Sequence, residues 1–571
     1  MMFFSDRTFS YTISKWLTGS ICVCCLLLFA CRQKPEAPKP VEIVKKPEDL
    51  NKKTFENIAS ILDFASANGG KLNDSVIFTS MPLVKAWYAQ KDSLITWSNQ
   101  KAWLQMADSL FDFIKHSETY GLFPTDYHYV QLNAIFEKLK KDSVSMLDAA
   151  LWARADVSFT DAFMQIARDI KLGRLQRDSI TLRKDTLFND SIGIALLQKV
   201  QQEKILTPVL QQLEPNYEGY REIRSFLPYF LDSMDRKAYT YINYPFEDSL
   251  EYISQLQTRL FEGGYISFND RAADTAELRA AVRSFQESKD LKVDGKAGPA
   301  VVAALNNTGI EQFRRIAINL DRYKQLPDSM PVKYLWVNLP AYKFELWDND
   351  TLRLESKVII GNPKTRTPVL TSELTNYVIF PQWTVPYSIV FKEMLPQIQR
   401  KVEYLDKQNL MVVDRNDSII DPHSVNWFKL NKNNFPYQLK QREGDDNSLG
   451  VIKFNFRNKY SVYLHDTNAR GLFSRKVRAL SHGCVRVQEW KKLSNYLVQN
   501  DSIRYKPDTL AAWMKRKEKH MVNFSKRLPI YIRYFTAAAK DGNIVLYDDI
   551  YAEDKIARDM YMGNRKVISA L

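Results

Sequence analysis

Cysteine is almost absent from this sequence beyond its first residues. The chain of 571 residues has five cysteines, and four of them lie within the first 31 positions. Cys484 is the only one after that point, so a chain without its N-terminal segment has no pair of thiols for a disulfide. A single free thiol in an oxidising compartment is a liability unless it is used. The scarcity of cysteine therefore favours a catalytic role for Cys484.

Long basic runs are also missing, although the formal net charge is +14. Lysine and arginine are spread along the chain, which is typical of a solvated surface with a modest basic excess. An anionic cell-wall polymer is the functional alternative. No nucleic-acid partner is expected, because the chain looks exported and has no motif that combines basic and aromatic residues. With 45% hydrophobic and 26% charged residues, the composition is that of a globular protein of about two to four domains.

The N-terminal segment is predicted to be a targeting sequence. Arg7 and Lys15 precede an apolar run at 16–30, which is short for a membrane-spanning helix. The run ends in LFAC at 28–31, which resembles a lipobox with Cys31 as the lipidated residue, although Phe29 departs from the usual small residue. An uncleaved signal anchor is the alternative. Both interpretations export the chain to the periplasm and tether it to the inner or outer membrane.

The motif around Cys484 has the layout of a cysteine nucleophile with a base. His465 and Asp466 are followed, after a spacer, by SHGCVR at 481–486. A thiol attacks as the thiolate, and a nearby imidazole can take its proton near neutral pH. Gly483 lets backbone N–H groups approach the place where an oxyanion would form.

This motif resembles the signature of the L,D-transpeptidase (YkuD-like) catalytic domain. The segments YKFELW at 342–347 and VIIGNPKTRTP at 358–368 are similar to early strands of that domain. YGLFPTDY at 120–127 and TDAF at 160–163 resemble the helical scaffold of the large periplasmic members, and FPQWTVP at 380–386 resembles the strand that leads into their capping lid. The resemblance implies a multidomain α+β protein that combines a helical scaffold, a three-helix peptidoglycan-binding-like domain and a mostly-β catalytic domain with an inserted helical lid.

The pattern along the chain predicts the boundaries of these parts. Helical spacing of apolar residues predicts a structural scaffold over 51–247 without chemistry of its own. Strand patterns begin near 332 and include 451–455 and 460–464. Three short helices around the turn VDGKAGPA at 293–300 resemble a peptidoglycan-binding domain, although a plain packing module is the alternative. The expected parts are a signal peptide (1–30), a Pro/Lys/Glu-rich tether (31–50), the scaffold (51–247), the binding domain (248–308), the catalytic domain (309–555) with a lid at about 388–447, and a C-terminal tail (556–571).

The resemblance implies a role for each residue of the catalytic pair. Cys484 would be the nucleophile that attacks a peptidoglycan stem tetrapeptide and releases the terminal D-alanine, and His465 would be the general acid and base. The thioester would then acylate the side-chain amine of a second stem and give a 3→3 cross-link without ATP or any other cofactor. Asp466 would orient His465, either by its backbone carbonyl or by its carboxylate.

The residues around this pair have candidate roles with open alternatives. Backbone N–H groups of Gly483 and Cys484, and that of His482 as a third candidate, would bind the oxyanion. Ser481 and His482 would shape the loop by hydrogen bonds, with His482 as a less favoured base. Arg486 would hold a substrate carboxylate or form an internal salt bridge.

Tyr463 and Trp383 would line the cleft or belong to the core. A zinc site formed by His465, His482 and Cys484 lacks a fourth ligand and is not favoured.

Three other activities share parts of this pattern. Attack of water on the same acyl-enzyme would make the chain an L,D-carboxypeptidase, and a protein acceptor would attach that protein to peptidoglycan. A non-catalytic peptidoglycan-binding lipoprotein would explain the tether and the 248–308 segment, but not an intact Cys-His motif.

Overall fold

The computed structural model describes residues 35–90, 95–99, 102–176, 188–499, 505 and 507–562. The expected signal peptide with Cys31 lies outside these residues, as do the start of the tether and the end of the tail. The chain divides into two compact units. The first holds the described residues up to 116, together with 124–169 and 188–213, and the second holds 117–123, 170–176 and the described residues from 214 onward. Within the described ranges, none of the helices is long and apolar enough to span a bilayer.

The first unit is helical, as the apolar periodicity predicted. Its helices are α2 (Leu50–Ala67), α3 (Met81–Ala89), α4 (Gln105–Lys115), α5 (Tyr129–Lys141), α6 (Ala149–Leu172), α7 (Asp190–Glu203) and α8 (Thr207–Gln211), accompanied by two short hairpins, β1 (Lys71–Asn73) with β2 (Val76–Ile77) and β3 (Ser98–Asn99) with β4 (Ala102–Trp103). The long helix α6 supplies much of the core, because an apolar stripe at helical spacing runs along it.

Two buried acids on α6 hold the neighbouring segments of the first unit in place. Asp156 accepts hydrogen bonds from the Tyr88 hydroxyl and from the backbone N–H groups of Thr96 and Trp97. Asp161 accepts from Ser80 N at 2.7 Å, at the N-terminus of α3, and its other oxygen lies 2.8 Å from the ring of His128 (α5 N-cap). These acids are satisfied by structural partners, which agrees with the expectation of a scaffold.

The second unit begins with two helices that flank a small three-helix domain along the chain. α9 (Glu218–Ser233) and α13 (Gly309–Lys324) share one apolar cluster, and α10 (Ser249–Glu262), α11 (Thr275–Ser288) and α12 (Pro299–Asn306) share another. Buried Gln286 fixes the turn between α11 and α12, because its side chain accepts from Asp294 N and Gly295 N and donates to the Asp294 carboxylate. The positive φ of Gly295 (+68°) suits this tight turn.

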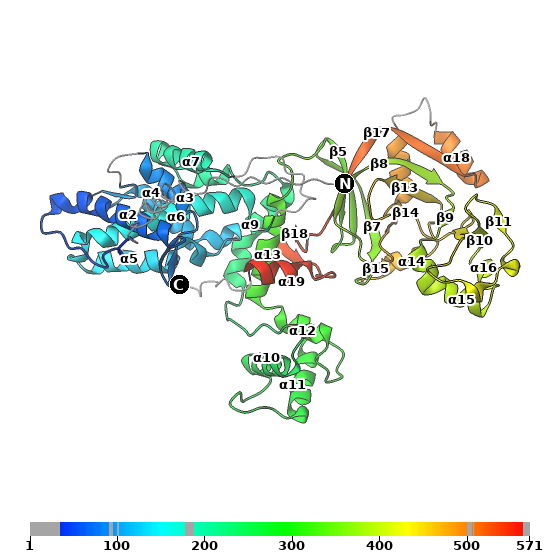
Figure 1. The fold of residues 1–571 in the computed structure, drawn as a ribbon, viewed down its shortest axis with the longest axis horizontal. Helices are drawn as coiled ribbons and strands as arrows, with labels where there is room; N and C mark the ends of the chain where they lie inside the picture. Colours follow the sequence, from blue (N-terminus) through cyan, green and yellow to red (C-terminus); the bar gives the residue numbers. More distant parts are fainter. Residues whose placement is uncertain are drawn as a thin grey trace, which may run out of the picture. The chain divides into compact units, whose positions relative to one another are not determined.

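A nine-stranded mixed sheet forms the centre of the second unit (Figure 1). Its order is β15-β7-β16-β14-β13-β8-β17-β5-β6. The strands are β5 (Lys333–Asn338), β6 (Lys343–Asp348), β7 (Thr351–Gly361), β8 (Leu370–Ile379), β13 (Ile452–Phe456), β14 (Leu464–His465), β15 (Ala479–Ser481), β16 (Val485–Val487) and β17 (His520–Arg533). α17 (Trp490–Val498) and α18 (Pro507–Arg516) follow β16, and the hairpin β18 (Ala537–Lys540) with β19 (Asn543–Leu546) precedes α19 (Glu553–Ala557).

The insertion expected to be a lid is a small subdomain with its own core. It contains α14 (Tyr387–Ile389), a π-helical turn (Val390–Met394), α15 (Leu395–Arg400) and α16 (Tyr404–Lys407). It also contains a four-stranded sheet of order β11-β10-β12-β9, made of β9 (Trp383–Thr384), β10 (Leu410–Val413), β11 (Ile419–Ile420) and β12 (Gln438–Gln441). The prediction of a helical lid was therefore incomplete. The polar spacing of 408–447 hid strands of only two to four residues.

The segment at 460–464 differs from its prediction as a strand. Only Leu464 belongs to β14, and Ser461 has a φ of +56°, which lies outside the β region of backbone conformation. The side chain of Asn458 imposes the loop, since it accepts from Tyr460 N and Val462 N and donates to Val462 O. The hydrogen bonds from the Asn458 side chain to the backbone thus outweigh the strand preference of the β-branched and aromatic residues in this segment.

Candidate active site

The register of β13, β14 and β16 brings five polar residues onto one face of the sheet. Lys453 pairs with His465, and His465 pairs with Arg486, so these three form a row across the strands. Tyr463 lies two residues before His465, and Cys484 lies two residues before Arg486. Side chains two positions apart share a face of a strand, so Tyr463 and Cys484 belong to this face as well.

The opposite face of these strands is core. The residues that alternate with the five polar ones are buried in the main hydrophobic cluster of the sheet: Ile452, Phe454, Leu464, Val485 and Val487. Because a shift of one residue would move every side chain to the other face, this apolar set fixes the register of the polar face.

Cys484 carries a thiol that the surroundings both desolvate and stabilise as thiolate. Burial raises the pKa of the Cys484 thiol above its ordinary value. The backbone N–H and the hydroxyl of Tyr463 oppose this shift, as do the positive charges of Lys453 and Arg486. The sulfur lies 3.9 Å from Ser461 O. The resting thiol is therefore protonated, with donors and cations in place for the moment when it ionises.

His465 is a neutral base in these surroundings. Its side chain is almost fully buried, and burial, Arg486 and Lys453 together lower its pKa to about 3. The backbone of Asp466 and Leu449 acts in the opposite direction. Nδ1 is buried without a hydrogen bond of normal geometry in the described part of the chain. Neutral imidazole can accept a proton at physiological pH, which an imidazolium cannot do.

The carboxylate of Asp466 is engaged away from the imidazole. It accepts from Val451 N at 3.1 Å and from the guanidinium of Arg470 at 2.6 Å. A Cβ on Gly450 would approach this carboxylate to 2.3 Å, so the position requires glycine. Of the two alternatives for orienting His465, the backbone of Asp466 is the one that acts on the ring.

The loop before Cys484 is closed by its own hydrogen bonds. The Ser481 hydroxyl donates to Cys484 O at 2.6 Å and accepts from Gly483 N at 3.1 Å. The Gly483 N–H expected to serve an oxyanion is therefore already engaged, whereas no described residue accepts from Cys484 N. Thr367 donates its hydroxyl to Gly483 O, and Gly483 has a φ of +120°, which favours glycine.

His482 turns away from the thiol. Its Nε2 lies 2.7 Å from a carboxylate oxygen of Glu393, in the π-helical turn of the insertion. This contact removes His482 as an alternative base, and it does not bring His482 together with His465 and Cys484 as metal ligands. No group of three or more His, Cys, Asp or Glu suited to a metal occurs among the described residues.

Arg486 and Lys453 have no acidic partner in the described ranges. No ion pair involves either residue there, and Arg486 Nε is buried without a hydrogen bond. The internal salt bridge considered for Arg486 is thus absent. Lys453 Nζ lies 4.1 Å from the centre of the Tyr463 ring. The sequence pattern missed Lys453, and the only available signal was its alternation with Ile452 and Phe454.

Tyr463 and Trp383 meet beside the thiol. The Cys484 thiol and the Trp383 indole act in opposite directions on the pKa of the Tyr463 hydroxyl, which burial raises strongly. Trp383 also packs against the core of the insertion. Both aromatic residues therefore contribute to the surroundings of Cys484, and Trp383 connects them to the insertion.

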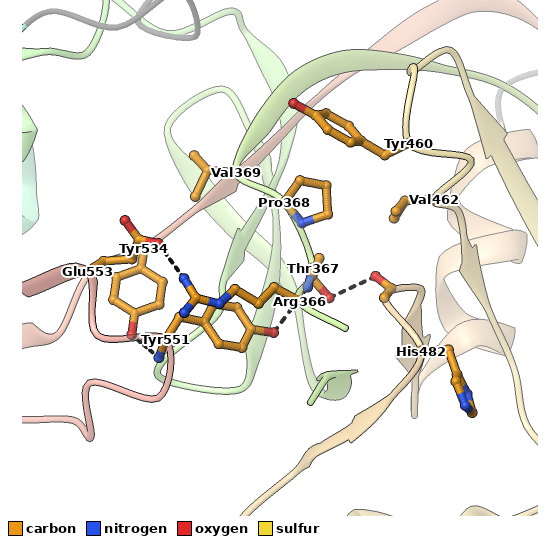
Figure 2. A pocket seen from close by; sticks show the side chains of 11 residues that line it. Arg366, Thr367, Pro368, Val369, Tyr460, Val462, His482, Tyr534, Tyr551 and Glu553 are labelled. Atoms are coloured by element: carbon orange, nitrogen blue, oxygen red, sulfur yellow. Dashed lines mark hydrogen bonds and ion pairs between the residues drawn. The ribbon is translucent and has the colours of Figure 1, made fainter. Parts of the chain in front are cut away.

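A cavity of about 410 Å³ borders the loop on another side (Figure 2). Gly483, Thr367 and Tyr551 are among its lining residues. Tyr551 donates its hydroxyl to Gly361 O and accepts from Thr367 N, which ties the C-terminal segment to the turn at 361–367. Figure 2 shows the side chain of His482 directed away from the other labelled residues.

Three family models match successive parts of the chain. The "L,D-transpeptidase catalytic domain" matches residues 332–507, the "Scaffold domain" matches 82–227, and the "Putative peptidoglycan binding domain" matches 249–305. A curated relative, the "Putative L,D-transpeptidase" of Haemophilus influenzae, is 35% identical over 266 residues, which is 45% of this chain and 51% of the relative. The chain thus spans about half the length of the curated relative it matches.

Solved structures of L,D-transpeptidases also align with the chain. The enzyme from Stackebrandtia nassauensis is 15% identical, with 51% of this chain and 94% of that chain covered at a TM-score of 0.15. The enzyme from Xylanimonas cellulosilytica is 15% identical, with 52% and 100% covered at a TM-score of 0.16. Residues 332–507 of the chain thus match an L,D-transpeptidase (YkuD) catalytic domain, and the segments that match a scaffold domain and a putative peptidoglycan-binding domain precede it.

Proposed function

We propose that the chain is an L,D-transpeptidase that cross-links peptidoglycan through a Cys484 thioester. The observation that carries the proposal is the shared face of Cys484 and His465, inside the segment that matches the family's catalytic domain. The cysteine is reactive only as thiolate, and a neutral histidine beside it can take the proton. Peptidoglycan stem peptides are the proposed donor and acceptor.

The proposed acylation begins from a neutral thiol and a neutral imidazole. His465 takes the proton of Cys484 as the sulfur attacks the carbonyl of the third stem residue. The tetrahedral oxyanion lies by the unengaged Cys484 N–H. The imidazolium then gives its proton to the leaving amine of D-alanine, which is favoured because burial, Arg486 and Lys453 all disfavour the charged ring.

Deacylation by an amine completes the proposed reaction. The side-chain amine of a second stem attacks the thioester, His465 takes its proton, and the thiol is regenerated as the new amide forms.

Trp383 and Tyr463 line the proposed substrate cleft, and Arg486 binds a substrate carboxylate. The insertion at about 388–447 is the proposed lid, because its residue Glu393 contacts His482 in the loop before Cys484. Trp383, in the strand that leads into the insertion, acts on Tyr463 beside the thiol.

Mass spectrometry tests the activity directly. The full chain in detergent is incubated with a disaccharide tetrapeptide, beside its Cys484→Ala variant. A dimer that has lost one D-alanine, formed only with Cys484, is the expected result. Tripeptide alone indicates an L,D-carboxypeptidase, and transfer only to an added protein amine indicates protein attachment. Unchanged donor in both samples, with folded protein and intact binding to sacculi, indicates a non-catalytic peptidoglycan-binding protein.

The location is proposed from the N-terminal sequence together with the matched domains. Peptidoglycan-associated domains suggest the cell envelope. We propose a periplasmic lipoprotein whose tether begins at Cys31. Metabolic labelling with an alkyne fatty acid should mark the wild-type chain and leave Cys31→Ser unmarked. Absence of label from both chains would refute the lipoprotein and favour the uncleaved anchor or no anchor, and equal label on both would place the lipid on a residue other than Cys31.

A further inference from the structure

Two partly buried cations next to the thiol, Lys453 and Arg486, lack an acidic partner among the described residues. Arg486 and Lys453 both lie on the polar face of the sheet, and burial lowers the pKa of each. Neither forms an ion pair with a described residue, and Arg486 Nε has no acceptor. A partly desolvated cation without an anionic partner costs free energy, and an anion bound between the two would offset that cost.

The two cations flank His465 and face the sulfur. The row Lys453, His465, Arg486 crosses three adjacent strands, and Cys484 is one step along the face from Arg486. Both cations lower the pKa of Cys484, so both are close enough to sense its charge. An anion held between them would therefore sit within reach of the reacting bond.

Cys484 itself does not supply the missing anion. Burial raises the pKa of the thiol, so the resting site holds two positive charges and no negative one. The Asp466 carboxylate is engaged by Val451 and Arg470. The remaining candidate is an anionic group of the ligand.

The chemistry of the donor identifies that group. In the proposed function, on which this inference rests, the leaving group is an amino acid whose free α-carboxylate lies one carbon from the scissile nitrogen. We propose that Lys453, together with Arg486, binds this carboxylate and so makes a free C-terminus a requirement for the donor. Arg486 offers a planar fork of donors, and Lys453 adds a point charge whose ammonium is held over the Tyr463 ring.

An alkylation experiment tests the cation pair without any assumption about the reaction. The full chain is treated with iodoacetate or with iodoacetamide, which differ in charge and hardly in size. Mass spectrometry of the peptide that contains Cys484 gives the two rates. The ratio of iodoacetate to iodoacetamide rates should fall at least about threefold in Lys453→Met and in Arg486→Met. Lys526→Met is the matched control, because it removes the same charge from an exposed position of β17.

A pair of donors tests the identity of the anion. The wild-type chain should use a tetrapeptide with a free C-terminal carboxylate at least about tenfold better, in kcat/KM, than the C-terminal amide. In Lys453→Met, the tetrapeptide with the free carboxylate should react more slowly while the amide reacts as before, so most of the preference should be lost. Lys453→Arg should keep much of the preference. A purely structural role of Lys453 would slow both donors equally.

The outcomes separate this inference from the proposed function. An unchanged alkylation ratio in Lys453→Met, with iodoacetamide still reacting at the wild-type rate, overturns the cation pair. A changed ratio with equal use of acid and amide by the wild type overturns the assignment to the C-terminal carboxylate. If no donor is consumed at all while iodoacetamide still reacts, the proposed function fails, and the alkylation ratio alone decides whether the anion site exists.

Discussion

The two units differ in whether their buried polar side chains have hydrogen-bond partners. In the first unit, Asp156 is fully buried and accepts three hydrogen bonds, and Asp161 is held by Ser80 N and by the His128 ring. On the catalytic sheet, His465 Nδ1 and Arg486 Nε are buried without a hydrogen bond of normal geometry to a described residue. A buried polar group with all its partners belongs to the architecture, whereas one without them is available to a ligand.

The hydrogen-bond partners of the buried histidines also distinguish the scaffold from the candidate site. Each region has a buried histidine with an aspartate close to it: His128 lies 2.8 Å from Asp161 in space, and His465 directly precedes Asp466 along the chain. Only the first pair is in contact through side chains. In the second, the carboxylate of Asp466 is engaged by Val451 N and Arg470, and the backbone of Asp466, not its side chain, acts on the ring.

The largest expected effect comes from replacing the unsatisfied histidine. His465→Asn removes the proton acceptor of the proposed reaction, so product formation should fall by about 10²-fold or more. Stability should be retained or increased, because an incompletely bonded imidazole leaves the interior. Product formation is measured by mass spectrometry and stability by chemical denaturation.

His465→Gln serves as the second variant, so that a folding defect in one of them does not decide the result. Product formation within about threefold of the wild type in both variants would contradict a role for His465 in proton transfer. The rate of Cys484 alkylation gives an independent check that the site is still accessible.

Loss of a satisfied acid should instead affect the scaffold alone. Asp156→Ala leaves the Tyr88 hydroxyl and the Thr96 and Trp97 N–H groups without their acceptor, which should destabilise the first unit by about 3 kcal/mol. Hydrogen exchange should rise in α6, while the rate of Cys484 alkylation stays constant. The control Asp63→Ala removes an exposed carboxylate from α2 and should change stability by less than about 0.5 kcal/mol. A change in Cys484 alkylation in Asp156→Ala would contradict the independence of scaffold and site.

The sequence alone predicted the features that depend on the residue pattern within one segment. The motif at 481–486, together with His465, located the site, and the alternation of 451–455 predicted β13. The helical periodicity of the first unit predicted its class correctly. These features rest on spacing along one segment, which a single sequence displays.

Contacts between segments that are far apart in the chain could not be predicted from the sequence alone. Lys453 reaches the site only because β13 pairs with β14 in one register, and no local signal fixes that register. The engagement of Gly483 N by Ser481 depends on a side-chain rotamer within the loop. The strands of the insertion were missed because two-residue pairings such as β11 carry no periodicity.

The response to pH should differ in sign between the two units. The pKa of Asp156 is raised by burial to about 6, so the folded first unit binds more protons than the unfolded chain between about 4 and 6. The contribution of Asp156 to stability therefore decreases as pH rises through this window. The pKa of His465 is lowered to about 3, so its contribution decreases as pH falls from about 6.5 towards 3.

Comparison with neutral variants isolates each contribution. Stability differences between the wild type and Asp156→Asn, and between the wild type and His465→Asn, are followed by local hydrogen exchange from pH 4 to 7. Relative to its variant, the wild-type first unit should gain stability towards acid, and the wild-type catalytic sheet should lose it. Parallel trends in both units would refute the contrast between them.

The contact between His482 and Glu393 should have the smallest effect. The two side chains are 45% and 52% exposed, and an exposed pair of this kind contributes about 0.2–1 kcal/mol. Glu393→Gln keeps the shape and removes the charge, so kcat/KM should change by less than about fivefold. Hydrogen exchange should increase in 387–400, because the π-helical turn loses a contact to the loop before Cys484. A loss of about 10²-fold would mean that Glu393 contacts the substrate, and would place a charged group of the insertion within the site that the sheet otherwise supplies.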